Sequence, residues 1–403
     1  MKYIYIVDCY ASSKTNGIGT YIRELMICLK EMEVNICHIA YYHDAKTFNI
    51  EENDGITQIQ IPVIQHFCVL HYNVFDKFLR LYIEDSPDNL FLFSYGPHEM
   101  LLKILKKSFP LSKIAFVIHD MTWTATLLGN SDELKKCFAL DMFEKNYPDS
   151  VEFFNEEKRM YETVDQILAL ASETVDVLQN VYKINKSKIT LIPNGLQNTY
   201  SKLSEKNTNR LKNKLFISLN EKVILFVGRL KHVKGIYQII SALKKVVKTY
   251  PDFRLVVVGA VFEAKKIIDH VGEIASKITF TGQISKDILS EWYQIADIGL
   301  LTSYWEQCSY TGIEMMMHGL PVVASDGFCV GDMFKDGVNA KIARIEDRNH
   351  PEEFENNLSE AFLKLLQSNE LRRKLGKNGR KIYESNYQII CMKERYQMFL
   401  NSL

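Results

Sequence analysis

The sequence predicts an α/β fold made of two doubly wound domains, each a parallel sheet covered by helices. Its 403 residues are too many for one ordinary core and fit two domains of about 150 to 200 residues each. Short β-branched and aromatic runs alternate with longer amphipathic segments along almost the whole chain, which is the pattern of such sheets. With 47% hydrophobic residues and no low-complexity run, the chain is expected to be globular throughout.

The predicted strands form two groups, one in each half of the chain. In the first half they span residues 3–7, 36–41, 58–61, 90–93, 114–118, 166–169 and 189–192. In the second half they span residues 223–227, 254–258, 278–280, 298–301 and 321–324. Ligands of doubly wound sheets bind outside the carboxyl ends of the strands, so two facing domains would place the site in the cleft between them.

We place the domain boundary just after the turn Pro193-Asn194-Gly195, where a strand ends. The stretch that follows, residues 201–214, is rich in Asn, Lys and Ser and is predicted to be a linker. The N-terminal domain then spans residues 1–197 and the C-terminal domain residues 198–386. The terminal segment, residues 387–403, has the apolar spacing of a helix.

Charge and composition argue against several kinds of partner. The 49 basic residues balance the 49 acidic ones, so no overall field attracts nucleic acid or an anionic membrane. No apolar stretch approaches the roughly 20 residues that span a bilayer, and Asp8 ends the first apolar run too early for a signal peptide. At most we expect peripheral membrane contact at Lys103, Lys106, Lys107 and Lys113, for which a solvated helix face is the simpler explanation.

The eight cysteines contain no Cys-x-x-Cys pair and no metal-ligand spacing. Several of them fall in apolar runs, where a free thiol behaves as a small hydrophobic group. We expect them to be reduced and mostly buried, which indicates a cytoplasmic protein without a metal site.

Two carboxylates at fixed spacing mark the first candidate site. The stretch Glu306-Gln-Cys-Ser-Tyr-Thr-Gly-Ile-Glu314 is predicted to lead from a loop into a helix, whose first N–H groups favour anions. A sugar phosphate would suit such a place. A structural alternative is a capping box, in which the Thr311 hydroxyl accepts from the N–H of Glu314 and the Glu314 side chain reaches back to the N-cap.

A glycine turn, Asn16-Gly17-Ile18-Gly19, follows the first strand and opens a helix. Glycines there let the backbone approach a phosphate or sugar. A nicotinamide site would want a third glycine at position 22, which is Ile. A plain structural turn is the alternative.

Two basic residues, Arg229 and Lys234, follow the first strand of the second half, and Gly235 lets the next helix begin close to a ligand. An Arg offers planar paired donors and a Lys a point charge, so together they can neutralise a diphosphate. Solvated surface charge is the alternative for this pair.

A His119-Asp120 pair ends the strand at 114–118, again at a carboxyl edge. A His in this place can hydrogen-bond a sugar hydroxyl, although most single His residues at strand ends are satisfied core residues.

Together these motifs resemble the family-4 retaining glycosyltransferases of the GT-B fold, whose mark is a Glu, seven residues and a second Glu ahead of a Gly-x-Pro-Val-Val-x-Ser strand. The resemblance implies two facing Rossmann-like domains with an interdomain cleft, and a last helix, residues 387–403, that packs back on the first domain. It implies these roles: Arg229 and Lys234 on the nucleotide diphosphate, Glu314 on the ribose, Glu306 on the donor sugar, His119 on that sugar from the opposite domain, Asp120 on the acceptor side, and Gly17 and Gly19 in the glycine loop.

The chain departs from this family at two places. Family members commonly read Gly-Phe-Gly after the first Glu, where this chain has Gln307-Cys308-Ser309, and they differ again after Asp326. Cys308, Ser309 and Tyr310 are therefore donor-side candidates whose ligand the resemblance does not identify. The wording of the motif is also similar to glycosyltransferases associated with small ribosomal peptides in gut Bacteroidales.

The resulting hypothesis is a cytoplasmic, metal-independent, retaining glycosyltransferase of the hexosyltransferase class that uses no cofactor. Its donor would be a UDP- or GDP-sugar, and its acceptor a hydroxyl of a saccharide, a lipid-linked saccharide or a peptide. No Asp-x-Asp, the metal-binding motif of many other glycosyltransferases, occurs in the sequence. Two alternatives remain: a non-catalytic GT-B subunit that binds a transferase or its peptide, and a GT-B sugar-nucleotide epimerase.

Overall fold

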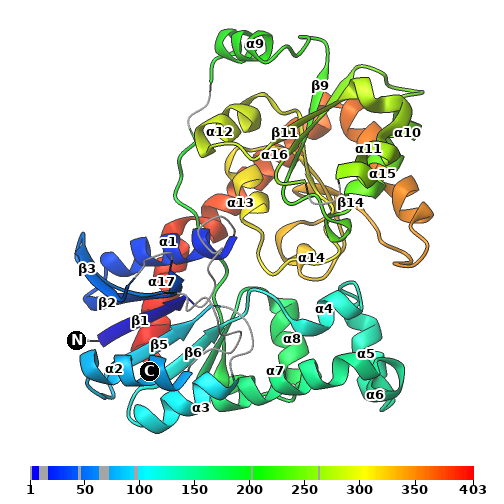
Figure 1. The fold of residues 1–403 in the computed structure, drawn as a ribbon. Helices are drawn as coiled ribbons and strands as arrows, with labels where there is room; N and C mark the ends of the chain where they lie inside the picture. The colour runs from blue at the N-terminus through cyan, green and yellow to red at the C-terminus, as the bar shows by residue number, and fades with distance from the viewer. Residues whose placement is uncertain are drawn as a thin grey trace. The chain divides into compact units, whose positions relative to one another are not determined.

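The computed structural model describes residues 2–8, 17–43, 47–62, 72–94, 99–200, 203–261 and 264–403. The chain divides into two compact units (Figure 1). The first unit comprises Met1–Gly195 together with Ile389–Leu403, and the second comprises Leu196–Gln388. Each unit is an α/β body built on one sheet, as the sequence predicts.

In its described part the first unit has an eight-stranded sheet in the order β3-β4-β2-β1-β5-β6-β7-β8. All pairs are parallel except β3 with β4. The strands are β1 (Lys2–Asp8), β2 (Val34–His43), β3 (Asn49–Asn53), β4 (Ile56–Pro62), β5 (Asn89–Phe93), β6 (Lys113–Val117), β7 (Gln166–Ala169) and β8 (Ile189–Leu191). Order reverses at β1, which lies between β2 and β5.

The strand β3 is absent from the sequence prediction because Asn-Ile-Glu-Glu-Asn has neither β-branched enrichment nor alternation. Its pairing comes from the turn. Asn53 pairs with Ile56, and the two residues between them, Asp54 and Gly55, both have positive φ, at 54° and 73°. An Asp-Gly pair is a strong hairpin signal. The sequence evidence for β3 is therefore this turn, and not the side chains of the strand itself.

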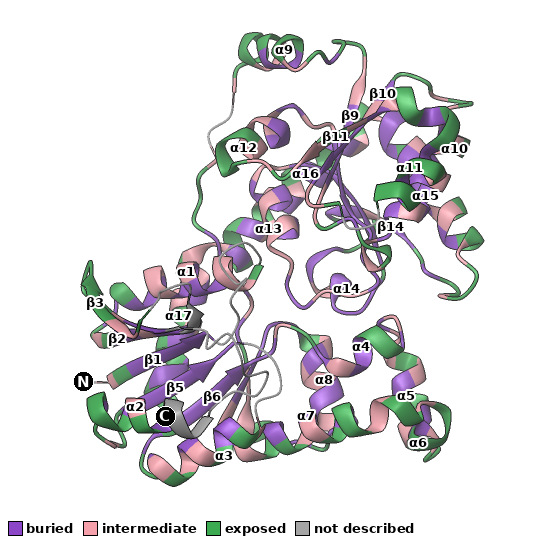
Figure 2. Cartoon of the chain, in the orientation of Figure 1, coloured by how far each residue is buried: buried purple, intermediate pink, exposed green. Residues whose placement is uncertain are grey.

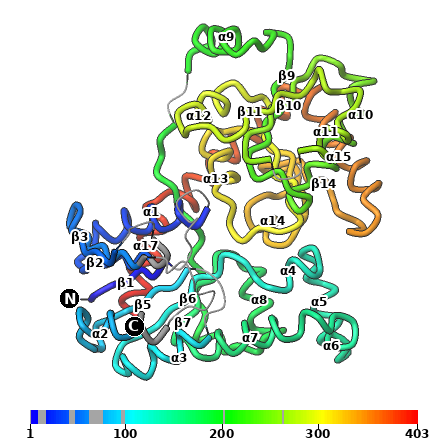
Figure 3. The backbone as a smooth tube through the Cα atoms, in the orientation of Figure 1, coloured from blue at the N-terminus to red at the C-terminus, as the bar shows by residue number. Residues whose placement is uncertain are grey.

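The helices of the first unit are α1 (Gly17–Lys30), α2 (Tyr72–Tyr82), α3 (Glu99–Ser108), α4 (Thr122–Thr126), α5 (Ser131–Ala139), α6 (Phe143–Asn146), α7 (Val151–Thr163), α8 (Ser172–Asn180) and α17 (Ile389–Ser402), with short 3-10 turns η2 (Pro148–Ser150) and η3 (Lys186–Lys188). The C-terminal helix α17 lies along α1, far from it in sequence (Figure 3). The hydroxyls of Tyr21 and Tyr396 hydrogen-bond across this contact, and Lys2 Nζ donates to the carbonyl of Leu400.

In the described residues of the second unit the sheet has six parallel strands in the order β11-β10-β9-β12-β13-β14. The strands are β9 (Lys222–Val227), β10 (Phe253–Val258), β11 (Ile278–Gly282), β12 (Ile298–Leu301), β13 (Val322–Ser325) and β14 (Ala340–Ala343). Numbered within the unit this order is 3-2-1-4-5-6, the Rossmann order, and it reverses between β9 and β12. The four-residue edge strand β14 was not predicted, since Ala-Lys-Ile-Ala carries little strand signal.

The helices of the second unit are α9 (Glu205–Lys214), α10 (Ile236–Val246), α11 (Ala264–Val271), α12 (Lys286–Ile295), α13 (Tyr310–Met317), α14 (Val330–Met333), α15 (Glu352–Gln367) and α16 (Asn369–Ile382), with the 3-10 turns η4 (His232–Lys234) and η5 (Gly272–Lys277) and the short π-helix η6 (Tyr383–Tyr387). One group, α10, α11 and α15, packs together, and α13 packs on β12 and α16. Part of the predicted linker is helix α9, capped by Ser204, whose side chain accepts from the N–H of Asn207.

The core of each unit lies between its sheet and its helices. Figure 2 shows the central strands of each sheet buried, whereas β3 and the outer faces of the helices are exposed. The central strands β5, β12 and β13 are buried at every residue, as expected for parallel strands covered on both faces. Across the described ranges, no helix combines the length and the apolar character that crossing a bilayer would need.

Candidate active site

The candidate site of the second unit lies where β9 and β12 end side by side. Phe226 pairs with Leu300, so the residues that follow the two strands leave the sheet at the same edge. This edge is also the point where strand order reverses, and open α/β sheets bind ligands there. Arg229 and Lys234 follow β9, and Glu306 follows β12, so the fold brings three predicted site residues to one edge.

Close backbone contact shapes the start of the β9 loop. Gly228 and Gly259 have φ angles of 155° and 143°. A Cβ on Gly259 would lie 1.9 Å from the carbonyl oxygen of Gly228, so the ends of β9 and β10 come together only because Gly259 has no side chain.

The segment with Lys234 is fastened to the loop that follows β12. Thr302 Oγ1 donates to the carbonyl of Lys234 over 2.9 Å, and the N–H of Tyr304 donates to the carbonyl of Val233 over 2.9 Å. Gly235 follows in the left-handed region, at φ 74°, and a Cβ there would lie 2.5 Å from the carbonyl oxygen of Thr302. This glycine therefore sets how closely the two loops approach.

Lys234 and Glu306 are joined directly. Lys234 Nζ lies 2.5 Å from Glu306 Oε1, and Ser303 Oγ donates to the same oxygen over 2.6 Å. The two charged side chains are 22% and 13% exposed, so the pair is mostly shielded from water but open on one side. Ser303 did not emerge from the sequence, because a single Ser after a strand carries no signal.

A second segment holds the Glu306 loop in place. The N–H of Glu306 donates to the carbonyl of Phe328, and the N–H of Phe328 donates to the carbonyl of Tyr304, each over 3.0 Å. A Cβ on Gly327 would lie 2.3 Å from the carbonyl oxygen of Ser303. The stretch after Asp326, where this chain departs from the family pattern, thus braces the loop that carries Glu306.

The N-terminus of helix α13 tests whether Glu314 belongs to a capping box with Thr311. Its N-cap is Ser309, whose Oγ accepts from the N–H of Gly312 over 3.4 Å, and Thr311 lies inside the helix. The capping box on Thr311 and Glu314 is therefore wrong. Instead Glu314 Oε2 accepts a hydrogen bond of 2.8 Å from the hydroxyl of Tyr293. Cys308 is buried, and Tyr310 opens the helix.

Arg229 is exposed, and within the described ranges its side chain makes no hydrogen bond or ion pair. A guanidinium in this state offers all its donors to a ligand. It differs in this respect from Lys234, whose charge is already paired with a carboxylate.

In the first unit, His119 and Asp120 come directly after β6. The His119 ring meets Tyr21 edge-on at 4.6 Å, and its Nε2 is shielded from solvent with no hydrogen-bond partner among the residues that the structure describes. Burial lowers the pKa of His119 to about 3, so the ring is neutral at physiological pH. Asp120 Oδ1 accepts from the N–H of Met121 over 2.9 Å and from Thr124 Oγ1 over 3.0 Å.

A buried carboxylate that the sequence analysis missed, Glu157 on α7, holds the chain just after Asp120. It accepts from the N–H of Thr122 over 3.0 Å, from Thr122 Oγ1 over 2.9 Å and from the hydroxyl of Tyr182. Burial raises the pKa of Glu157 to about 7. Its position in the helix gave a signal, because it lies three residues from both Phe154 and Met160 on the buried face.

The glycine loop is described only in part. Helix α1 begins at Gly17 and continues through Gly19, whereas Asn16 lies outside the described residues. A Cβ on Gly17 would meet no described atom within 4 Å. The role of Gly17 and Gly19 at a ligand remains a prediction.

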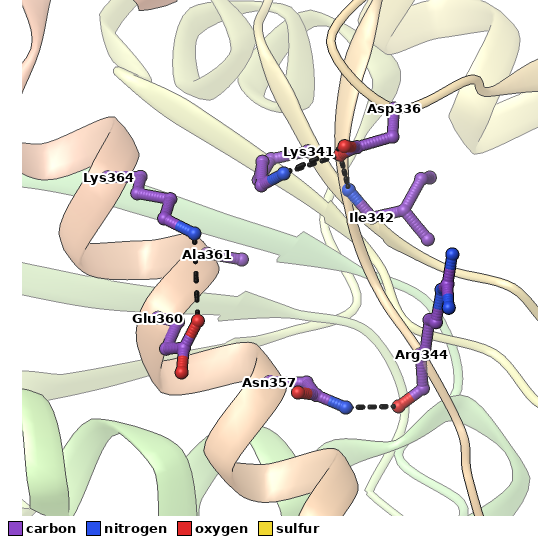
Figure 4. Close-up of a pocket in the computed structure, with 8 residues that line it drawn as sticks. All are labelled: Asp336, Lys341, Ile342, Arg344, Asn357, Glu360, Ala361 and Lys364. Carbon is purple, nitrogen blue, oxygen red and sulfur yellow. Dashed lines mark hydrogen bonds and ion pairs between the residues drawn. The ribbon is translucent and has the colours of Figure 1, made fainter.

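One surface pocket of about 270 Å³ lies between β14 and α15, and none of the predicted site residues lines it (Figure 4). Four of its five charged side chains form ion pairs, Asp336 with Lys341 and Glu360 with Lys364, and the fifth is Arg344. The described parts of both units hold no group of three or more His, Cys, Asp or Glu side chains placed to bind a metal ion.

Residues 207–382 match the family model described as Glycosyl transferases group 1. The chain is 27% identical over 176 residues to Spore coat protein SA of Bacillus subtilis (strain 168), covering 41% of this chain and 45% of that protein. It spans about half the length of the curated relatives it matches.

Solved structures agree over the whole chain. Sucrose-phosphate synthase from Thermosynechococcus elongatus has a TM-score of 0.78 at 16% identity, covering 100% of this chain and 99% of that one. Anabaena Alr3699/HepE in complex with UDP-glucose has a TM-score of 0.70 at 14% identity and covers 100% of both chains. The architecture is therefore the GT-B fold, as predicted. The match to the Glycosyl transferases group 1 model lies within the second unit.

Proposed function

We propose that this chain is a metal-independent, retaining glycosyltransferase that moves a sugar from a UDP- or GDP-sugar to a hydroxyl acceptor. The observation that carries the proposal is the hydrogen-bonded group of Lys234, Glu306 and Ser303 where the strand order of the second sheet reverses, with an exposed Arg229 in the same segment after β9 as Lys234. The two cations, Arg229 and Lys234, suit a diphosphate, and the carboxylate and hydroxyl of Glu306 and Ser303 suit the hydroxyls of a sugar.

In this proposal the second unit holds the donor. Arg229 and Lys234 stabilise the negative charge that develops on the leaving diphosphate, which is the main electrostatic contribution to such a transfer. Glu306 binds hydroxyls of the donor sugar, and Glu314 binds the ribose. The group 1 match of this unit supports these assignments, as does UDP-glucose in the HepE structure of the same fold.

The first unit contributes His119, and Asp120 on the acceptor side. As a neutral ring, His119 accepts or donates a hydrogen bond to a sugar hydroxyl without adding charge. The bond between the anomeric carbon and the phosphate oxygen breaks, and the acceptor oxygen bonds to that carbon on the same face. The acceptor proton passes to the leaving phosphate, so no protein nucleophile and no cofactor is needed.

The acceptor we favour is a saccharide, and a lipid-linked saccharide or a peptide hydroxyl is chemically equivalent at the reacting oxygen. We place the reaction in the cytoplasm, because no disulfide joins any of the six described cysteines. The motif wording shared with glycosyltransferases of ribosomal peptides in Bacteroidales makes a peptide acceptor worth including in any screen.

A thermal-shift screen of UDP, GDP and their sugars tests the donor, since a ligand that binds only the native state raises the melting temperature. Turnover with acceptor panels then separates the alternatives. A transferase consumes nucleotide sugar only with an acceptor, or slowly with water, and the anomeric configuration of the product reports retention. An epimerase converts the nucleotide sugar alone, and a non-catalytic subunit consumes none.

A further inference from the structure

We propose that Tyr293 is a positioning residue that fixes the Glu314 carboxylate for binding hydroxyl groups of the nucleotide sugar. The inference rests on the proposed function, from which it takes the donor contact of Glu314. Tyr293 belongs to helix α12 and lies outside the sequence motifs of the candidate site.

The contact is a charge-assisted hydrogen bond with a fixed direction. The Tyr293 hydroxyl donates to Glu314 Oε2 over 2.8 Å. Burial, and then the neighbouring Glu314 charge, raise the pKa of Tyr293 well above its ordinary value, so the hydroxyl keeps its proton and can only donate to this carboxylate. Hydrogen bonds to an ionised acceptor are roughly twice as strong as neutral ones.

Packing fixes the orientation of the Tyr293 ring and therefore the direction of its hydroxyl group. Tyr293 is 4% exposed, and its ring stacks on His318 with centroids 4.9 Å apart and planes 23° apart. His318 is the C-cap of α13, four residues after Glu314 on the same helix, and it meets Tyr200 edge-on at 5.0 Å. A ring held in this way loses little further freedom when a ligand binds.

Electrostatics around the stack also protect the contact. Burial and then the Arg380 charge lower the pKa of His318 to about 4, so this ring is neutral at pH 7 and does not draw the carboxylate away from Tyr293. Arg380 itself donates to the carbonyl of Met317 and to Asn198 Oδ1. It thereby anchors the end of the helix that carries Glu314.

The two carboxylates of the motif are therefore oriented by different means. Glu306 is held by a cation and a hydroxyl, and Glu314 by a phenol from another helix. A carboxylate accepts about four hydrogen bonds in total. The Tyr293 hydrogen bond to Oε2 restricts rotation of the Glu314 carboxylate, and a carboxylate of fixed orientation suits a vicinal pair of hydroxyls such as those of ribose.

The test uses the full chain and the variant Tyr293→Phe, which keeps the stacked ring and removes only the donor. The matched control is Tyr250→Phe, whose hydroxyl makes no hydrogen bond to any described residue. Calorimetric titration with UDP and GDP, and with their 2′-deoxy counterparts, gives the affinities. We expect Tyr293→Phe to bind its nucleotide about tenfold more weakly, to raise KM with kcat within about twofold, and to lose part of its preference for ribose. The control should bind like wild type.

A cycle with Glu314→Ala separates positioning from general damage. If Tyr293 acts through Glu314, adding Tyr293→Phe to Glu314→Ala weakens binding no further, even where the melting temperature falls. A further loss in the double variant, or wild-type affinity in Tyr293→Phe while Glu314→Ala binds poorly, overturns the inference and leaves the proposed function intact. Wild-type affinity in Glu314→Ala, or no binding of UDP or GDP by wild type, instead contradicts the proposed function.

Discussion

Lys234 Nζ and Glu306 Oε1 lie 2.5 Å apart and join the loops that follow two neighbouring parallel strands. The cation proposed for the diphosphate and the carboxylate proposed for the sugar are thus one charged pair before any ligand binds. A partly buried carboxylate that loses its only cation becomes a repulsive neighbour for a phosphate.

This pairing predicts that Lys234→Met alone weakens nucleotide binding more than the double variant does. Lys234→Met leaves the Glu306 carboxylate beside the diphosphate, so nucleotide affinity should fall more in Lys234→Met than in Lys234→Met with Glu306→Gln. Calorimetric titration of the four proteins gives the coupling, which should exceed about 0.5 kcal/mol. If the two substitutions change the binding free energy additively, within about 0.5 kcal/mol, the ion pair does not persist in solution.

Glu306→Ala alone should still lower turnover by at least about tenfold, because a contact worth about 1.4 kcal/mol in the transition state is lost.

A second prediction concerns Gly235, where conformation and space act together. Gly235→Ala places a Cβ 2.5 Å from the carbonyl oxygen of Thr302, at φ 74°. Gly337→Ala is the matched control, because Gly337 has a similar φ of 68° but no heavy atom within 4 Å of the added Cβ. The control should cost about 1 to 2 kcal/mol from backbone strain alone.

Gly235→Ala should lower the free energy of unfolding, measured in urea, by more than the control does. It should also weaken nucleotide binding, because Thr302 and Ser303 must shift together. Equal losses of stability in the two variants, with unchanged nucleotide affinity in both, would mean that the loops are not tightly coupled.

Desolvation of the His119 ring predicts a loss of stability in acid. Its pKa of about 3 in the folded chain lies below the ordinary 6.5, so the unfolded chain binds the extra proton first. The neutral ring contributes stability that is fully present above pH 6.5 and is lost as pH falls toward 3. Relative to wild type, His119→Phe should therefore gain stability as pH falls from 7 to 4.5 in urea titrations. A pH-independent difference between the two proteins would place His119 in water.

Glu157 should show the opposite dependence. Its pKa of about 7 in the folded chain lies above the ordinary 4.5. The stability that its protonated form contributes is fully present below pH 4.5 and is lost as pH rises through about 7. Glu157→Gln cannot ionise, so its stability relative to wild type should rise between pH 4.5 and 8. The same urea titrations measure this, and a difference that is constant over the range would contradict the raised pKa.

Sequence patterns predicted those parts of the fold and site that depend on local chemistry. Runs of β-branched residues predicted most strands. The strands β3 and β14 were missed because β3 depends on its hairpin turn with β4 and β14 is a short strand at the edge of the sheet. Arg229 and Lys234 were candidates because they follow a predicted strand, and Glu306 because of its spacing from Glu314 ahead of a predicted helix. The parallel strands β9 and β12 bring the three residues to one edge. Tyr293 and Glu157 were missed because each acts through a hydrogen bond to a residue far away in the sequence. Glu314 lies 21 residues from Tyr293, and Thr122 lies 35 residues from Glu157. The capping box failed because Ser309, two residues before Thr311, takes the N-cap.

The most direct test of the account is turnover of a UDP- or GDP-sugar by desalted enzyme, measured as nucleoside diphosphate released in the presence of a saccharide acceptor. Wild type, Arg229→Ala and Lys234→Ala are assayed with excess chelator and then with added magnesium. We predict that wild-type turnover survives the chelator and that each variant falls about a hundredfold, since an uncompensated leaving diphosphate costs on the order of 3 kcal/mol. Loss of wild-type turnover with chelator and its return with magnesium would contradict the mechanism, because a metal would then supply the charge assigned to Arg229 and Lys234.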